Sequence, residues 1–354
     1  MNKNIDTTYR FPAEWEKQSA IMLIMPHEDT DWKPYLAEIT ETYVQMADAI
    51  TQYEHLLLTT KDIEETKDLL SARLSKEQMA RIIFFECDNN DTWARDVAPI
   101  SLVAKDGSRR MLDFCFNGWG EKFSAEKDNK INALVAKAGL FNADLVRHKD
   151  FILEGGSIES DGKGTLFTTT SCLLAPHRNQ PLTKEDITQY LLLNIFSERV
   201  IWLEHGELEG DDTDGHIDTI VRCAPNDTLL YIKCEDKNDT HYTDFKALEE
   251  QLKTLRTLNG KPYRLLALPF TEAVCDDGER LPATYANFVI LNGAVLVPTY
   301  AQPDKDEKAL KIIKQAFPSY DIIGIDAQTV VRQHGSLHCL TMQLPEGFLA
   351  TDSK

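Results

Sequence analysis

The feature that most constrains the fold of this 354-residue chain is a recurring order of elements: two strands joined by a turn, then a helix, then a further strand. Short apolar runs such as RIIFFEC, RVIWLE and YRLLALPF indicate strands. Apolar residues at steps of three and four indicate helices. Four hairpins are predicted at 97–117, 151–173, 217–235 and 285–299, with helices near 127–139, from 183, at 241–257 and at 305–317. The order predicts a repeated ββαβ unit.

The two ends of the chain supply what looks like a fifth unit. A strand at 19–25 precedes a helix at 33–53, and a strand at 337–343 has no sequential partner. Pairing these strands would close a ring. We therefore expect a single α/β domain over 1–354, a five-bladed pseudo-symmetric propeller of ββαβ units. The repeat is longer than the usual periods of about 20–50 residues, and an ordinary two-domain α/β fold is the alternative.

Composition narrows the function classes. The chain has 57 acidic and 38 basic residues and a net charge of −19, which argues against a nucleic-acid partner. It has no apolar run of about 18 residues and no apolar signal region near its start, so we expect a cytoplasmic protein without a membrane partner. Its seven cysteines include no C-x-x-C pair, which disfavours a disulfide framework or a zinc ribbon.

Unusual polar clusters lie where predicted hairpins begin. They are TWARD (92–96), FILEGGS (151–157), EGDDTDGHID (209–218) and GSLHC (335–339). In a ring of repeats, equivalent positions converge on the axis. We therefore expect one cavity to be faced by a set of residues distant in sequence: Asp96, Glu154, His216, Asp218 and Cys339.

Each cluster also has a simpler interpretation. The DDTDG segment fails the EF-hand pattern, because Gly210 and Val221 stand where acids are required. His216 and Asp218 lack a clear third ligand for zinc. Asp96 beside Arg95 is compatible with a structural ion pair.

Two further residues have simpler interpretations of their own. Trp93 alone is compatible with a core position. His338 should point to the opposite face of its strand from Cys339, so it is not the expected partner of that thiol.

Together these residue types suit chemistry on a guanidinium group. Carboxylates match its fork of N–H donors and balance its charge. A thiolate can attack its central carbon, and a histidine can protonate departing ammonia and then activate water. This inventory makes Cys339 the candidate nucleophile.

These motifs resemble the agmatine deiminases, within the wider bacterial peptidylarginine-deiminase-like family of guanidine-modifying enzymes. The resemblance covers nearly the whole chain. It rests on FPAEWEKQSAIMLIMP, TWARDVAPI, LEGGSIESDGKGTLFTTTSCLL, DTDGHID and GSLHC, in the family's order.

The resemblance implies the five-bladed propeller of the pentein fold. It also implies hydrolysis of agmatine to N-carbamoylputrescine and ammonia, in putrescine (polyamine) biosynthesis, through an S-alkylthiouronium intermediate and without cofactor or metal. The implied roles are a nucleophile, Cys339; a general acid/base, His216; two guanidinium carboxylates, Asp96 and Asp218; a carboxylate that orients the histidine and helps to hold the substrate, Glu154; and a slot-lining ring, Trp93.

The chain departs from the family pattern near its nucleophile. Gln333, His334 and Ser336 replace members of the family's glycine run and its Asn. Asp212, where many relatives have Glu, would meet the distal ammonium of agmatine.

Alternatives remain at the far end of the substrate. The Asp211-Asp212 pair favours a distal amine, whereas free arginine would need a cationic clamp for which Arg222 and Arg178 are weak candidates. Peptidyl-arginine, a non-catalytic binding protein on the same scaffold and a metal-dependent hydrolase are further alternatives. Family analogy alone suggests a homo-oligomer.

Overall fold

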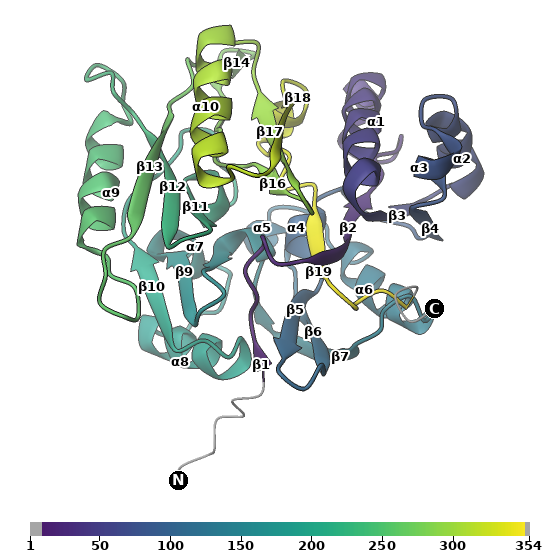
Figure 1. The fold of residues 1–354 in the computed structure, drawn as a ribbon, viewed down its shortest axis with the longest axis horizontal. Coiled ribbons are helices and arrows are strands. Elements are labelled where there is room, and N and C mark those ends of the chain that lie inside the picture. Colours follow the sequence, from purple (N-terminus) through teal and green to yellow (C-terminus); the bar gives the residue numbers. More distant parts are fainter. Residues whose placement is uncertain (1–8, 351–354) are drawn as a thin grey trace.

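The computed structural model describes residues 9–350, and a mixed α/β fold accounts for them. Residues 1–8 and 351–354, the ends of the domain expected over 1–354, lie outside the described residues. Five sheets are arranged about a common centre, with the longer helices towards the outside (Figure 1). This arrangement directs the starts of several hairpins towards the middle of the molecule.

The five sheets share one strand pattern, in which an antiparallel pair is followed by a parallel strand. The first is β5 (Ile100–Ala104), β6 (Arg109–Cys115) and β7 (Asp144–Ile152), with β1 (Tyr9–Arg10) at its edge. The second, third and fourth are β8 (Ile158–Ser160), β9 (Thr165–Thr169) and β10 (Arg199–Leu203); β11 (Val221–Ala224), β12 (Thr228–Lys233) and β13 (Arg264–Pro269); and β16 (Val289–Ile290), β17 (Ala294–Thr299) and β18 (Asp321–Asp326). The fifth is β19 (Met342–Pro345), β2 (Gln18–Ile24), β3 (His55–Thr60) and β4 (Ile82–Glu86); β14 (Cys275–Asp276) and β15 (Glu279–Arg280) form a separate small pair.

A helix joins the second strand of each unit to the parallel strand that follows, as parallel pairing requires a crossover. These helices are α6 (Asp128–Lys137), α8 (Lys184–Asn194), α9 (Tyr242–Thr254), α10 (Pro303–Ala316) and α1 (Leu36–Tyr53), the last preceded by η1 (Lys33–Tyr35). The remaining helices are α2 (Ile63–Ser71), α3 (Lys76–Met79), α4 (Ala94–Val97), α5 (Gly118–Glu121), α7 (Thr170–Leu173), η2 (Gly155–Ser157), η3 (Ile217–Thr219) and η4 (Val330–Gln333). The predicted hairpins and helices thus match the observed units.

The predicted pairing of the two terminal strands is confirmed. Met342 and Leu344 of β19 lie opposite Met22 and Ala20 of β2 in antiparallel register. β2 then pairs in parallel with β3, which completes the fifth unit.

The start of the C-terminal strand was predicted too early. It begins at Met342, whereas Leu337–Leu340 form a turn in which Leu340 N–H donates to the Leu337 carbonyl. Asn287 explains the difference. Its carbonyl accepts from His338 N–H, and its side-chain oxygen accepts from Cys339 N–H, so these groups are not available to a strand ladder.

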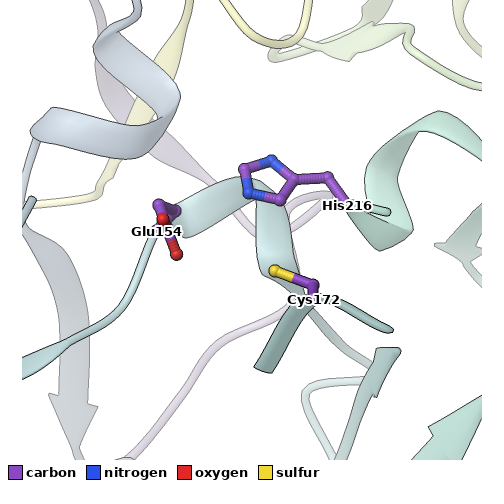
Figure 2. Close-up of side chains that lie close together, drawn as sticks. All are labelled: Glu154, Cys172 and His216. Atoms are coloured by element: carbon purple, nitrogen blue, oxygen red, sulfur yellow. The ribbon is translucent and has the colours of Figure 1, made fainter. Parts of the chain in front are cut away.

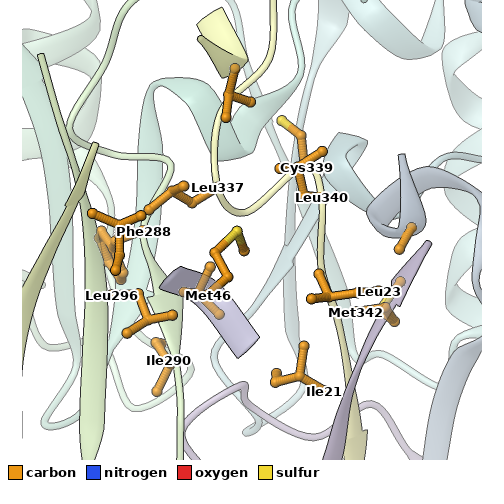
Figure 3. Packing of buried hydrophobic residues seen from close by; sticks show 14 of the residues in the cluster. Ile21, Leu23, Met46, Phe288, Ile290, Leu296, Leu337, Cys339, Leu340 and Met342 are labelled. Carbon is orange, nitrogen blue, oxygen red and sulfur yellow. The ribbon is translucent and has the colours of Figure 1, made fainter. Parts of the chain in front are cut away.

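The core beneath this turn is apolar and continuous. Leu337 and Leu340 are buried on either side of Cys339, among Met46, Phe288 and other members of one large cluster (Figure 3). These contacts fix the backbone that carries the thiol. Within residues 9–350, no helix has the length and apolar character needed to cross a membrane.

The closing strand should contribute strongly to stability. Leu344 is fully buried in β19, so Leu344→Ala should lower the free energy of unfolding by about 2–5 kcal/mol through lost apolar contact and a residual cavity. Leu258→Ala is the matched control, because Leu258 is 42% exposed and its loss should cost within about 0.5 kcal/mol. Urea denaturation of both variants measures the difference. Equal, small effects would mean that the β19–β2 pairing is dispensable.

Candidate active site

Cys339 lies in the buried turn that precedes β19. Its Sγ is 3.3 Å from Oδ1 of Asn287 and 3.9 Å from Oδ2 of Asp218. Burial and the nearby Asp218 and Asp96 carboxylates raise the pKa of the Cys339 thiol well above its usual range. In the free protein the sulfur is therefore held as a thiol, and a cation placed beside it would favour the thiolate.

Asn287 was not predicted from the sequence, yet it holds Cys339, the candidate nucleophile. Its side-chain oxygen accepts from both the backbone N–H and the thiol of Cys339, and its Nδ2 lies 3.4 Å from the Asp218 carbonyl. A signal for it existed. Polar clusters were assigned to the starts of four units but not to the 285–299 hairpin, and Asn287 is the polar residue that lies there.

Asp96 is held in short helix α4 by two donors. The indole Nε1 of Trp119 donates to its Oδ2 at 3.0 Å, and the Gly156 amide donates to its Oδ1 at 2.9 Å. Burial is the main cause that raises the pKa of Asp96, while His216 acts to lower it. Trp119 comes from the irregular segment around α5, whose pattern gave no sign of a site.

His216 precedes η3 and reaches Asp96, with Nδ1 3.7 Å from Oδ1. Both of its ring nitrogens are buried without a hydrogen-bond partner among residues 9–350. Burial disfavours the imidazolium, but Asp96, Cys172 and Glu154 together raise the pKa of His216 well above its usual range. A Cβ on Gly156 would lie 2.5 Å from Nδ1, so only glycine lets the ring approach this closely.

Glu154 comes from the start of the second unit and is fully buried. Its Oε1 accepts from Nε of Arg178 at 2.8 Å, and its Oε2 has no partner among the described residues. The same guanidinium donates to Asp214 and to the Thr213 carbonyl. Arg178, considered above as a clamp for a substrate carboxylate, is thus already bound on three sides.

Asp218 is anchored from behind by His338. The His338 ring pairs with Oδ2 of Asp218 at 2.7 Å through Nδ1 and with Glu14 at 2.9 Å through Nε2. Although burial alone would raise it, the pKa of Asp218 is lowered by the hydrogen bond and charge of His338. The Oδ1 atom of Asp218 is buried without a partner among the described residues. His338 therefore holds Asp218 in place. Its side chain was expected to point away from Cys339 because residues alternate along a strand, but this reason is wrong because the segment is a turn.

Arg222, the other candidate for binding a substrate carboxylate, contacts Glu14 and His338. It is fully buried and donates to Glu159, to Glu14 and to the carbonyls of Ala286 and Phe288. His338, Arg95 and Arg222 lower the pKa of Glu14 well below its usual range against the opposing effect of burial. Arg222 has no free face for a ligand.

A pocket of about 430 Å³, open solvent at its mouth included, leads to Cys339. Its lining is acidic and aromatic and includes no Lys or Arg among the described residues. The acids are Asp91, Asp96 and Asp212, and the rings are Trp93, Trp119 and Phe123. Trp93 stacks edge-on against Trp119 at 6.3 Å between centroids.

Asp212 and His334 lie at the outer part of this pocket. Burial raises the pKa of Asp212 to about 6, with His334 acting to lower it and Asp211 to raise it. His334 adopts a left-handed φ of 62° and its Nδ1 lies 2.7 Å from the Gly210 carbonyl. Asp211, in contrast, bonds the hydroxyl of Thr213 and the amide of Gly215, so it shapes the loop rather than the pocket.

The other departures from the family pattern also have defined contacts. Gln333 bonds Tyr35 and the Asp31 carbonyl, and the Ser336 hydroxyl lies 3.0 Å from that of Tyr300. Between them, a Cβ on Gly335 would overlap the Trp93 ring. Glycine at this position is therefore required for the close approach of the backbone to Trp93.

All five predicted central residues thus meet around one point, and Trp93 and Asp212 line the approach to it. The sulfur of Cys339 contacts Asp218, Asp96 contacts His216, and Glu154 lies with His216 beside Cys172 (Figure 2).

Comparisons with known proteins identify the family of this chain. Residues 10–345 match the family described as Porphyromonas-type peptidyl-arginine deiminase. A curated protein from Marinomonas sp. (strain MWYL1), named "Putative agmatine deiminase", is 34% identical over 96% of this chain and 95% of its own length.

Two solved structures are similar over nearly the full chain. One, titled "Putative Arginine Deiminase" from Porphyromonas gingivalis, is 47% identical with a TM-score of 0.91, over 96% of this chain and 99% of the other. The other is C. jejuni agmatine deiminase, a Cys-to-Ser variant with substrate bound, at 38% identity and a TM-score of 0.88, over 96% and 97%. The resemblance inferred from the motifs is confirmed, and the chain belongs to the Porphyromonas-type peptidyl-arginine deiminase family.

Proposed function

We propose that this protein is an agmatine deiminase, a hydrolase of the C–N bond of a linear amidine that converts agmatine to N-carbamoylputrescine and ammonia. The observation that carries the proposal is the pocket in front of Cys339, lined by three aspartates and by no Lys or Arg among the described residues. Agmatine carries a positive charge at both ends, so this lining suits its whole length. Relatives named for the same activity support the proposal.

Arginine and peptidyl-arginine are the competing substrates. The P. gingivalis structure is described as a putative arginine deiminase, and the matched family as a peptidyl-arginine deiminase. An arginine carboxylate would need a cationic partner, but Arg178 and Arg222 are both engaged with buried carboxylates. Near the mouth, Lys122 is bound to Asp214 and to the Asp212 carbonyl. The distal group is therefore better explained as an ammonium facing Asp212.

In the proposed reaction, polar atoms without partners define the guanidinium site. Oδ1 of Asp218 and Oε2 of Glu154 are buried and unsatisfied in the described residues, and Asp96 faces the same space. Buried acceptors without donors are rare and costly. The N–H fork of the substrate satisfies them and places its carbon beside the Cys339 sulfur, while its charge offsets the carboxylates that keep the thiol protonated.

Catalysis then needs two proton transfers by one group. When the cation binds, the Cys339 thiol releases its proton to solvent. The thiolate then adds to the guanidinium carbon, and protonated His216 gives its proton to the departing nitrogen, which leaves as ammonia. Neutral His216 takes a proton from water, which adds to the thiouronium carbon. Collapse breaks the C–S bond, yields the ureido product and regenerates Cys339. The charge of Glu154 helps to raise the pKa of His216, and this raised pKa suits the first step.

The proposal extends to the organisation of the protein. Five units of the same strand order, closed by the β19–β2 pair, support a five-bladed propeller that acts as one catalytic domain. We place the reaction in the cytoplasm, without a nucleic-acid or membrane partner. The net charge of −19 supports the part of this proposal that excludes nucleic acid, because like charges repel. A homo-oligomer rests on family analogy alone.

An ammonia-release assay with agmatine, arginine and a capped arginine peptide tests the function. Agmatine should be consumed with the highest kcat/KM, and Cys339→Ser should reduce turnover at least about 1,000-fold because the nucleophile is lost. Cys275→Ser, at an exposed cysteine, is the matched control and should retain activity. Wild-type turnover by Cys339→Ser would exclude the covalent route, and preference for arginine would exclude the assigned substrate.

Asp212 should act in binding rather than in chemistry. Asp212→Asn removes the charge opposite the distal ammonium, so KM for agmatine should rise about tenfold, equivalent to about 1.4 kcal/mol, with a smaller change in kcat. Asp211→Asn is the neighbouring control, because Asp211 bonds its own loop. A larger effect of Asp212→Asn on kcat than on KM would move Asp212 to the reacting centre.

The titration of Asp212 should appear in the pH dependence of binding. With a pKa of about 6, its carboxylate is charged above that pH and neutral below it. KM for agmatine should therefore rise by up to about tenfold between pH 7 and pH 5, and in Asp212→Asn this rise should disappear. If the rise persists in Asp212→Asn, the titrating group is not Asp212.

A further inference from the structure

A second cysteine lies behind the candidate active site and has no part in the proposed reaction. Cys172, in short helix α7, is fully buried. Its sulfur, a carboxylate oxygen of Glu154 and a ring nitrogen of His216 all lie within 4.8 Å of one another. Figure 2 shows the three side chains directed towards a shared space. They come from three different segments, so their convergence is a product of the fold.

Two of these three side chains have unsatisfied atoms. Oε2 of Glu154 and both nitrogens of His216 are buried without a hydrogen-bond partner among residues 9–350. A bound guanidinium would use the side of this space that faces Cys339. The side that faces Cys172 offers a soft thiol, which a guanidinium does not require. A ligand that uses all three atoms must accept sulfur, nitrogen and oxygen together.

That donor set is typical of one class of ion. Zn²⁺ binds Cys sulfur, His nitrogen and carboxylate oxygen at about 2.0–2.3 Å in tetrahedral sites, whereas Ca²⁺ and Mg²⁺ prefer oxygen alone. Donor atoms around a tetrahedral ion lie nearer together than 4.8 Å, so the three side chains need to close inward by about 1 Å.

The charges around the site favour a cation. Asp96 and Asp218 lie beside Glu154 and His216, and the single guanidinium of Arg178 is shared with Asp214. Cys172 binds as a thiolate and His216 as a neutral ring, so protons leave when the ion enters.

The other cluster with metal-ligand spacing, Glu14, Glu159 and His338, differs in this respect. Arg222 donates to both of its carboxylates, and Asp218 pairs with its histidine. The ligand atoms of that cluster are therefore already paired, whereas Oε2 of Glu154 and both nitrogens of His216 have no partner among the described residues.

We propose that Glu154, Cys172 and His216 form an inhibitory binding site for Zn²⁺, separate from the nucleophile Cys339. Occupation takes the nitrogen of His216 and the free oxygen of Glu154 away from agmatine, so the ion and the substrate exclude each other. The inhibitory part of the inference rests on the proposed function; the binding part does not.

Binding is best measured in a Cys339→Ser background, which removes turnover and the other active-site thiol. Equilibrium dialysis should show one Zn²⁺ per chain, and Co²⁺ in its place should give a thiolate-to-metal charge-transfer band. Cys172→Ala in this background should weaken Zn²⁺ binding at least about tenfold and abolish the band, since loss of even outer-shell partners has an effect of about 10–100-fold. Cys234→Ala, at another buried cysteine remote from the site, is the matched control and should change neither.

Two further measurements separate the possible failures. Agmatine binding to the Cys339→Ser, Cys172→Ala double variant shows whether the pocket is still folded. If Zn²⁺ binds with unchanged affinity after Cys172→Ala, the site is elsewhere and the inference is wrong. In the enzyme with Cys339 intact, Zn²⁺ should raise the apparent KM for agmatine without lowering the maximal rate. If agmatine is not a substrate but Cys172-dependent Zn²⁺ binding is found, the proposed function fails while the metal site stands.

Discussion

Met342 and Leu344 of β19 lie opposite residues of β2 that are more than 300 positions earlier in the chain, and this single antiparallel pair completes the fifth sheet. Everything at the centre depends on it. The turn just before β19 carries Cys339, and without the pair the sulfur would have no fixed relation to Asp96 or Asp218. The entropic cost of closing so long a loop grows only slowly with its length. A short but fully buried strand can therefore offset it.

With the fifth sheet complete, the next constraint is the number of buried carboxylates that the fold brings together. Each is given a partner on its outer side: Glu154 has Arg178, Asp218 has His338, and Asp96 has Trp119. Their inner oxygens include atoms with no donor in the described residues. An unsatisfied buried group costs about 1–3 kcal/mol. The free protein bears this free-energy cost, and a bound ligand rich in N–H donors removes it by satisfying these oxygens.

The sequence was sufficient for the units and for their polar starts, because hydrophobic periodicity and turn residues act locally. It was insufficient where a residue distant in the sequence determines the backbone conformation. Residues 337–341 have the composition of a strand, but Asn287 takes their amides and makes a turn. Arg178 and Arg222 were visible as cations, yet only the fold shows that each is consumed by buried acids. Asn287 itself could have been found from the one unit left without a polar residue at its start. Trp119 could not, since its irregular backbone has no periodic pattern.

The position of the closing turn has a consequence for how such a protein is made. Synthesis proceeds from the N-terminus, so Asp96, Glu154, His216 and Asp218 all leave the ribosome well before Cys339. A growing chain that has built four units presents this group of carboxylates without the Cys339 thiol, and Cys172 is the thiol already beside them. The Cys339 sulfur arrives just before β19, the strand that completes the fifth sheet. The order of residues along the chain thus places the Cys339 thiol on the last of these segments to be synthesised.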